Sequence, residues 1–234
     1  MLFQEYFDII SKSYSTVSVL SNKNGGTVIR LRNKQIKRDM ILKKYISPVP
    51  AYDFLENIRH RNLPEVYDAV TLEDAAVVLE EYVDGVTVAQ VLESGLYTYH
   101  GAKKILLGVC SALITLHGMG IIHRDIKPEN VMIDTLGTVK LIDLGASRRY
   151  DPNRSRDTEV LGTIGYASPE QMGIAQCDER TDIYAMGVLL NVMLTGEHPS
   201  KKLAKGKAGR IVLKCTQIDP DSRYQSVEKL MRAI

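Results

Sequence analysis

The chain has 234 residues, enough for one large domain or two small lobes. Its hydrophobic content of 44% and charged content of 25% are those of an ordinary globular protein. A formal net charge of only +2 gives no indication of a nucleic-acid or membrane-surface partner.

The three cysteines are scattered, and their odd number argues against a disulfide framework. We therefore expect reduced thiols and a cytoplasmic location. The first residues lack the basic region and long apolar core of a signal peptide. No apolar run is long enough to span a bilayer, so we expect no membrane contact within this chain.

The first part of the chain predicts short strands at residues 17–20, 27–31 and 40–43, which are β-branched or apolar and separated by turn-forming sequences. Lys43 ends the third strand, with Lys44 beside it. Strand alternation directs one of the two side chains inward and the other to solvent. We favour Lys43 as the inward one because it follows an apolar triplet.

A short helix is the next element. Pro48 and Pro50 allow it to begin only around residue 50, so it would have about two turns. Glu56 is its sole glutamate. Residues 77–81 then predict another apolar strand, which ends in two acidic residues.

The pattern becomes helical beyond this strand. Apolar residues recur at helical spacing in residues 87–93 and 100–117, and Gly118 suits a helix C-terminus. Helices are also expected around residues 208–214 and 226–234. The lysine-rich stretch before residue 208 is too short for another helix.

An acid, a base and an amide lie at short fixed spacing in residues 123–130: Asp125, Lys127 and Asn130. Asp143 follows at the end of a strand-like segment. A polar turn with capping residues would explain either motif alone. The two motifs in this order resemble the catalytic loop and the metal-binding loop of eukaryotic-type protein kinases, in their serine/threonine form.

The resemblance implies a role in phosphoryl transfer for each of these residues. Asp125 would orient an attacking hydroxyl and accept its proton, and Lys127 would neutralise charge on the moving phosphoryl group. Asn130 and Asp143 offer hard oxygen ligands that suit Mg²⁺ between protein and phosphates. The implied cofactors are ATP and Mg²⁺, with Mn²⁺ as a possible substitute.

In this family a glycine-rich loop covers the ATP phosphates. Its pattern falls here on Ser21, Lys23, Gly26 and Val28, with Gly25 as an added neighbour. Gly26 and Val28 are the residues we expect to bind ATP. By itself the segment is better explained as an ordinary hairpin turn, and only the resemblance of the remaining chain supports the kinase interpretation.

Lys43 matches the ATP-orienting lysine of the family, which normally pairs with a glutamate on a helix. Glu56 lies too close to His60 to align well with that glutamate. Glu80 falls at a usually apolar position behind the nucleotide, where a buried carboxylate is costly unless paired. We hypothesise that Glu80 pairs with Lys43, supplementing or replacing Glu56. The alternative is a shifted register with Glu80 in solvent.

Residues 146–170 resemble an activation segment. Thr163 matches the threonine that bonds the catalytic loop, and residues 168–170 stand in for the family's Ala-Pro-Glu motif. Further on, Asp182 matches the helix aspartate that bonds the catalytic-loop backbone. Arg223 matches the arginine that pairs with the glutamate of the Ala-Pro-Glu motif.

Thr158 is the expected regulatory residue, because it lies on the stretch that this family commonly autophosphorylates. Phosphate there would add negative charge, which Arg124 would pair with. Ser155 is a second candidate. The competing interpretation is an unmodified loop, since Asp157 and Glu159 flank Thr158.

The resemblance implies an α+β, two-lobed protein kinase fold forming one catalytic domain. Residues 1–83 would form a small β-rich lobe with a shortened helix C, ending in a hinge where Glu81 to Val83 bond adenine. Residues 84–234 would form a mainly helical lobe that lacks most of one docking helix. The compact chain resembles bacterial members of the family.

The implied activity is Mg·ATP-dependent phosphorylation of serine or threonine in proteins, with autophosphorylation that would involve a transient homodimer. The rival interpretation is a pseudokinase that binds nucleotide or acts as a scaffold, because glycines are missing and the helix glutamate is doubtful. A small-molecule phosphotransferase shares the catalytic logic. Thr163 and residues 168–170 argue instead for a protein substrate.

Overall fold

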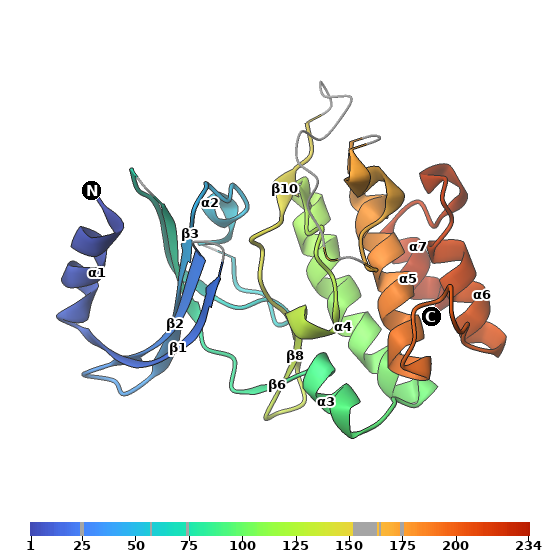
Figure 1. Ribbon diagram of the computed structural model, residues 1–234, viewed down its shortest axis with the longest axis horizontal. Helices are drawn as coiled ribbons and strands as arrows, with labels where there is room; N and C mark the ends of the chain where they lie inside the picture. The colour runs from blue at the N-terminus through green and yellow to red at the C-terminus, as the bar shows by residue number, and fades with distance from the viewer. Residues whose placement is uncertain (24–25, 57, 74, 152–162, 164, 174–175) are drawn as a thin grey trace. The chain divides into compact units, whose positions relative to one another are not determined.

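The computed structural model describes residues 1–234 except 24–25, 57, 74, 152–162, 164 and 174–175 (Figure 1). The chain divides into two compact units. The sheet unit consists of Met1–His60 and Pro64–Val83, and the helical unit consists of Arg61–Leu63 and Asp84–Ile234.

The sheet unit contains an antiparallel five-stranded sheet with the strand order β1-β2-β3-β5-β4. The three strands predicted in the first part of the chain lie within β1, β2 and β3, and each extends further than its apolar stretch. The strands are β1 (Tyr14–Lys23), β2 (Gly26–Asn33), β3 (Asp39–Tyr45), β4 (Val66–Thr71) and β5 (Ala76–Glu81).

Helix α1 (Phe3–Ser11) covers one face of this sheet and was not predicted from the sequence. Its apolar residues Phe3, Tyr6, Phe7 and Ile10 recur at the spacing of one helix face and pack against the buried sheet residues. These sheet residues are Ile29, Leu31, Met40, Leu42, Ala75, Val77 and Leu79.

Helix α2 (Tyr52–Leu55) has four residues, so the prediction of about two turns was too long. Tyr52 and Leu55 are buried, whereas Asp53, Phe54 and Glu56 are exposed. Within α2 the buried apolar side chains are Tyr52 and Leu55, which are three residues apart on one face of the turn. A second turn would have little apolar surface to pack against the sheet. Helix α2 is therefore even shorter than the shortened helix that the sequence predicts.

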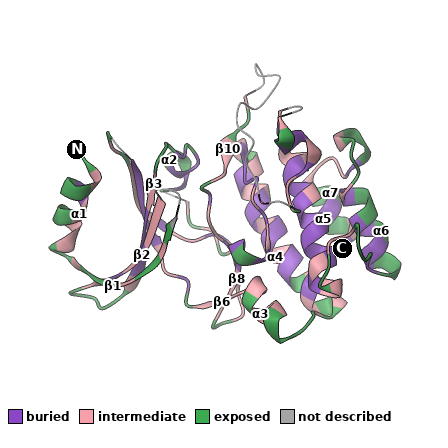
Figure 2. Cartoon of the chain, in the orientation of Figure 1, coloured by how far each residue is buried: buried purple, intermediate pink, exposed green. Residues whose placement is uncertain are grey.

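The helical unit is built around two long helices whose inner faces are buried (Figures 1 and 2). Shorter helices and 3₁₀ turns surround them. The helices are α3 (Val88–Ser94), α4 (Tyr99–Gly118), α5 (Glu179–Thr195), α6 (Gly206–Cys215) and α7 (Val227–Ala233), and the 3₁₀ turns are η1 (Pro128–Asn130), η2 (Pro169–Met172) and η3 (Pro220–Ser222).

Two small sheets complete the helical unit. One has the order β6-β8-β9, and the other pairs β10 with β7. Their strands are β6 (Gly85–Thr87), β7 (Ile121–Ile122), β8 (Val131–Asp134), β9 (Val139–Leu141) and β10 (Arg148–Arg149). The turn between β8 and β9 contains Gly137 at a φ of +76°, a conformation that favours glycine.

Residues 61–63 group with the helical unit, although the predicted first lobe runs from residue 1 to residue 83. Three hydrogen bonds tie them to β9. Asn62 Nδ2 donates to the Val139 carbonyl at 2.7 Å, Leu141 N to the Asn62 carbonyl at 2.9 Å, and Lys140 Nζ to the Leu63 carbonyl at 3.0 Å.

The stretch between Pro199 and α6 holds no helix, as the sequence analysis expected. In the part of the chain that the structure describes, no helix combines the length and the apolar character that crossing a membrane requires.

Candidate functional site

The Asp182 carboxylate anchors the backbone of the loop that follows α4. Asp182, fully buried in α5, accepts the backbone N–H of His123 at 2.9 Å and that of Arg124 at 2.8 Å. The Arg124 backbone has a φ of +68°, so these bonds help to hold a strained conformation. Burial alone would raise the pKa of Asp182, but hydrogen bonds and charge interactions with His117 and His123 together outweigh it, and the pKa is lowered.

Asp125 lies at the centre of the loop and is held by three side chains. Lys127 Nζ lies 2.7 Å from Asp125 Oδ2, and Asn130 Nδ2 donates to the same oxygen at 2.9 Å. Thr163 Oγ1 donates to Asp125 Oδ1 at 2.7 Å and accepts from Lys127 Nζ at 2.7 Å. A carboxylate, an ammonium group and a hydroxyl therefore form one closed cluster.

Asn130 and Asp143 are brought together by the backbone. Ile142 N donates to the Asn130 carbonyl at 2.9 Å, directly before Asp143, whose φ is +65°. The Asn130 amide nitrogen faces Asp125, donating also to its carbonyl oxygen at 2.8 Å, which leaves Oδ1 as the group that can coordinate.

These oxygens fit a magnesium ion. Mg²⁺ is usually held by one or two carboxylates, with water and phosphate supplying the other ligands. The described residues contain no group of three or more His, Cys, Asp or Glu side chains that could enclose a metal. The donor set of Asn130 and Asp143 therefore suits an ion that is shared with a phosphate ligand.

The sheet unit contains a buried ion pair between neighbouring strands. Lys43 Nζ lies 2.8 Å from Glu80 Oε1, and the two side chains are only 7% and 5% exposed. In the sheet register Lys43 lies opposite Val78 and Glu80 opposite Ile41, which places the two charged side chains diagonally on one face. This is the pairing hypothesised from the sequence.

Helix α2 contributes a hydroxyl group rather than a carboxylate to this pair. Tyr52 Oη donates to Glu80 Oε2 at 3.3 Å, and Tyr45 Oη lies 3.0 Å from Tyr52 Oη. Glu56, the other candidate partner, is exposed at the end of α2. Lys44 lies on the opposite face, where its Nζ is 4.7 Å from the centre of the Phe3 ring.

The remaining residues proposed to bind nucleotide also lie in the sheet unit. Gly26 begins β2 opposite Lys23, and the half-buried Val28 lies opposite Lys43. Glu81 ends β5, where its N–H donates to the Glu65 carbonyl at 2.8 Å. The adjacent Val83 is buried.

The proposed phosphorylation sites Thr158 and Ser155 lie outside the described residues. Thr163 is described and contacts the Asp125 cluster, as stated above. Arg124, which was expected to pair with the negative charge of the phosphate, is buried. Its backbone carbonyl accepts a hydrogen bond from Gln171 Nε2 at 2.8 Å.

A second buried ion pair joins η2 to the segment before α7. Arg223 donates to Glu170 Oε1 at 2.7 Å and to Oε2 at 2.9 Å, and Thr181 Oγ1 donates to Oε1 at 2.9 Å. Burial alone would raise the pKa of Glu170, but the hydrogen bonds and the charge of Arg223, together with the hydrogen bond from Thr181, outweigh it and lower the pKa.

Sequence reasoning missed several supporting residues. Tyr52, which donates to Glu80, and Tyr45, which contacts Tyr52, carried no local signal because they lie far from Glu80 in the sequence. His117 was assigned only to a helix, yet its Nε2 lies 2.7 Å from Asp182 Oδ2. Gln171 directly follows Glu170, and that adjacency was the one available indication of its role.

The chain is similar to known proteins along almost its whole length. A family model described as the protein kinase domain matches residues 13–232. A probable serine/threonine-protein kinase of Clostridium perfringens is 31% identical over 76% of the chain and 30% of its own length. Serine/threonine-protein kinase PrkC of Bacillus subtilis is 31% identical over 74% of the chain and 31% of its own length.

Serine/threonine-protein kinase PknB of Mycobacterium tuberculosis is 37% identical over 61% of the chain and 24% of its own length. The chain therefore spans less than a third of the length of these three relatives. The family match confirms the fold class that the sequence predicted, with its β-sheet lobe and its helical lobe.

Proposed function

The chain belongs to the protein kinase domain family, and we propose on that premise that it transfers the γ-phosphate of ATP to serine or threonine side chains of proteins. The observation that carries this proposal is the closed cluster of Asp125, Lys127 and Thr163, joined by distances of 2.7 Å. The names of the bacterial relatives support a protein substrate.

In this proposal Asp125 orients the attacking hydroxyl and accepts its proton. Lys127 and Asn130 fix the carboxylate from two sides, so the group is positioned before a substrate arrives. Lys127 also places a positive charge where negative charge develops on the transferred phosphoryl group. Thr163 connects the activation segment to this cluster, which would make a correctly placed segment part of the catalytic arrangement.

Asn130 and Asp143 would hold Mg²⁺, and a bound ion would neutralise charge on the nucleotide phosphates. Lys43 would hold the phosphates from the sheet unit, oriented by Glu80. Gly26 and Val28 would cover the nucleotide, and the backbone of Glu81 and Val83 would bond adenine. Mn²⁺ could take the place of Mg²⁺ with the same oxygen ligands.

Autophosphorylation at Thr158, or at Ser155, within a transient homodimer is part of the proposal. It is supported by the sequence pattern of the activation segment. A cytoplasmic location is also proposed, and it is supported by Cys110, Cys177 and Cys215, which are free and buried.

The intact mass of the purified protein before and after incubation with Mg·ATP tests the proposal. The wild type should gain phosphate, while Asp125→Asn and Asp143→Asn should not. Asp8→Asn, an identical change on the exposed face of α1, is the matched control and should behave as the wild type. A generic protein substrate and an ATP titration complete the test. A protein that binds ATP but phosphorylates neither itself nor the substrate would be a pseudokinase.

A further inference from the structure

A cavity of about 290 Å³ lies in the helical unit, where α4, β9 and the segment that holds Arg61 meet. Its walls carry two cations, Arg61 and Lys104, and the hydroxyl group of Thr138. Leu107 and Val139 supply apolar surface beside them. None of the residues proposed for phosphoryl transfer lines this cavity.

Close backbone packing shapes the cavity. A Cβ atom added at Gly108 would lie 2.6 Å from Val139 Cβ, so glycine lets α4 approach β9 this closely. Asn62 Nδ2 donates to the Val139 carbonyl at 2.7 Å and holds a further wall against the same strand. Lys104 extends from α4 toward the turn between β8 and β9, because its Nζ lies 3.6 Å from the position that a Gly137 Cβ would occupy. The ammonium group therefore lies beside the turn that bounds the cavity.

Within the described residues, the two cations of this cavity have no acidic partner. Neither the Arg61 guanidinium nor the Lys104 ammonium forms a hydrogen bond or an ion pair there, and the Thr138 hydroxyl forms no hydrogen bond. The acid of the adjoining turn is Asp134, whose Oδ1 accepts the backbone N–H groups of Leu136 at 2.9 Å and Thr138 at 2.7 Å. Two positive charges and a hydroxyl donor thus line the cavity without a described carboxylate that neutralises them.

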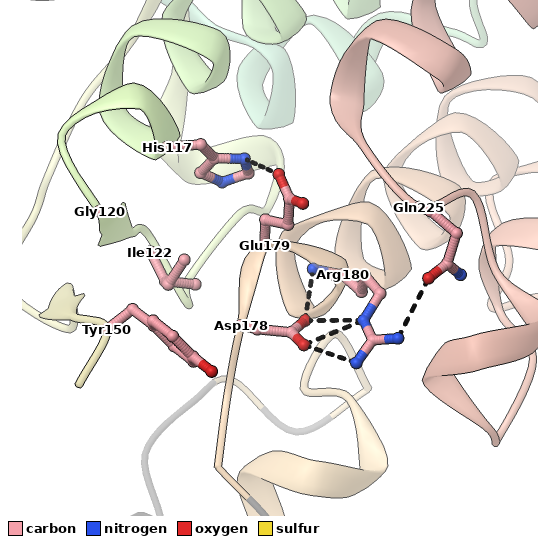
Figure 3. A pocket seen from close by; sticks show the side chains of 8 residues that line it. All are labelled: His117, Gly120, Ile122, Tyr150, Asp178, Glu179, Arg180 and Gln225. Carbon is pink, nitrogen blue, oxygen red and sulfur yellow. Dashed lines mark hydrogen bonds and ion pairs between the residues drawn. The ribbon is translucent and has the colours of Figure 1, made fainter. Parts of the chain in front are cut away.

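A larger cavity of the same unit, of about 390 Å³, has its charged groups paired within the protein (Figure 3). There Glu179 Oε2 lies 3.7 Å from His117 Nδ1, and the Arg180 guanidinium donates to Asp178 at 2.7 Å (Figure 3). That cavity therefore offers a charged ligand little that the protein does not already use. The smaller cavity differs because its two cations have no such partners among the described residues.

We propose that the cavity at Arg61 and Lys104 binds an oxyanion, either a carboxylate or a phosphate group. A guanidinium can donate to two oxygens at once, and an ammonium group adds further donors and a second positive charge. The Thr138 hydroxyl would donate as well, and a short stem would lie against Leu107 and Val139. The volume is near the lower end of the range of small-ligand sites, about 300–1,000 Å³, which suits one side chain or a small ion. The site does not depend on the proposed kinase activity.

Two sources carry this chemistry, namely an acidic side chain of a protein segment and a free phosphate ion. N-acetyl-glutamate amide represents the first source and inorganic phosphate the second, and N-acetyl-glutamine amide is the uncharged ligand control. Each is added to the methyl-labelled protein at low salt, and NMR follows the methyl groups of Leu107 and Val139. Saturable shifts of these methyl groups with at least one of the two anions are expected, with at least about tenfold weaker binding of the uncharged probe. The anion that binds more tightly identifies the source.

Arg61→Gln and Lys104→Gln each remove one positive charge, and each should weaken binding of the anion by about fivefold or more. Both side chains are exposed, so the variants should fold as the wild type does. The matched controls are Arg210→Gln and Lys202→Gln, the same changes at exposed cations outside the cavity, which should leave binding unchanged. Thermal unfolding shows whether all four variants are folded.

The titration of the unaltered protein tests the proposal even if a variant does not fold. The methyl groups of Leu213, which is exposed on α6 and outside the cavity, should not shift with either anion. Absence of saturable shifts at Leu107 and Val139 with both anions would overturn the proposal. Equal binding of the uncharged probe would also overturn it, as would equal losses of binding in the cavity variants and their controls, because any surface cation would then attract the anion as well.

Discussion

Lys43 on β3 forms its ion pair with Glu80, a residue of the neighbouring strand β5. In the family the partner glutamate lies on a helix, which can move relative to the sheet. Here both charged groups belong to hydrogen-bonded neighbouring strands, and Tyr52 fixes the second carboxylate oxygen. The two charges of the pair therefore both belong to the sheet, and α2 contributes only the Tyr52 hydroxyl group.

The buried Lys43–Glu80 pair predicts that removing one of the two charges lowers the free energy of unfolding more than removing both. Glu80→Met should lower the free energy of unfolding by about 3–5 kcal/mol, because Lys43 is left as an uncompensated buried charge. Replacing both residues, in Lys43→Met with Glu80→Met, should recover most of this loss because two apolar side chains can pack together. Urea unfolding of the three proteins measures the effect. Equal losses in the single and double variants would contradict a buried pair.

The same pair predicts an effect on turnover. Glu80→Gln keeps the volume but weakens the hold on Lys43, so phosphate transfer should fall by roughly ten- to a hundredfold. Glu56→Gln makes the same change on the exposed end of α2 and should leave the rate within about twofold of wild type. Radiolabelled phosphate incorporation compares the two. A large loss in Glu56→Gln alone would show that α2 supplies the working partner.

Glu170 and Arg223 predict a pH dependence of stability. The pKa of Glu170 in the folded protein is lower than its ordinary value of 4.5, so the ionised carboxylate stabilises the fold above that pH. This contribution is lost as the pH falls through the lowered pKa. The stability advantage of wild type over Glu170→Gln should therefore shrink on acidification from neutral pH to about pH 3. Unfolding by urea across this range tests it, and a constant difference would speak against the ion pair.

At the scale of elements, α1 precedes the residues 13–232 that the family model matches, and it packs on the sheet. Tyr6 is 5% exposed and packs on the sheet core, and its hydroxyl donates to Asp68 Oδ2 at 2.6 Å on β4. The helix thus covers one face of the sheet through apolar contacts, and the Tyr6 hydroxyl adds a hydrogen bond to β4. Short α2 covers much less of the opposite face.

Two substitutions at Tyr6 separate these contributions. Tyr6→Ala removes a buried aromatic ring and should cost about 3–5 kcal/mol of unfolding free energy. Tyr6→Phe keeps the ring and removes the hydroxyl, which should cost about 1 kcal/mol. Thermal or urea unfolding gives both values. If Tyr6→Ala were as mild as Tyr6→Phe, α1 would not be a packed part of the sheet unit.

At the scale of the whole molecule, the chain has two hydrophobic cores. The sheet unit is centred on residues such as Leu31 and Leu42, and the helical unit on residues such as Leu113 and Leu189, all almost fully buried. A core of this kind unfolds as a local cooperative unit when it is weakened.

Hydrogen exchange should reveal the two cores. Tyr6→Ala is expected to raise amide exchange in β2, β3 and β5 before it raises exchange in α4 and α5. Mass spectrometry of peptides from both units, compared with the wild type, provides the measurement. A uniform increase over the whole chain would mean that the two cores unfold as one.

The sequence by itself determined the features that depend on short spacing. Asp125, Lys127 and Asn130 lie within six residues, so the loop that carries them brings them together wherever the rest of the chain lies. Apolar patterns likewise predicted β1, β2, β3, β5, α3 and α4, because burial of one face selects their period. These motifs were sufficient to predict the kinase fold.

Only the tertiary structure decided which distant groups meet. The sequence left open whether Glu80 pairs with Lys43 or lies in solvent, and the register of β3 and β5 places it beside Lys43 while Glu56 is exposed. β3 and β5 are neighbours in the sheet but not consecutive in the chain, so no hairpin turn in the sequence fixes their register. For the same reason the packing of α1 on the sheet, and the contact of His117 with Asp182, became visible only in the folded chain.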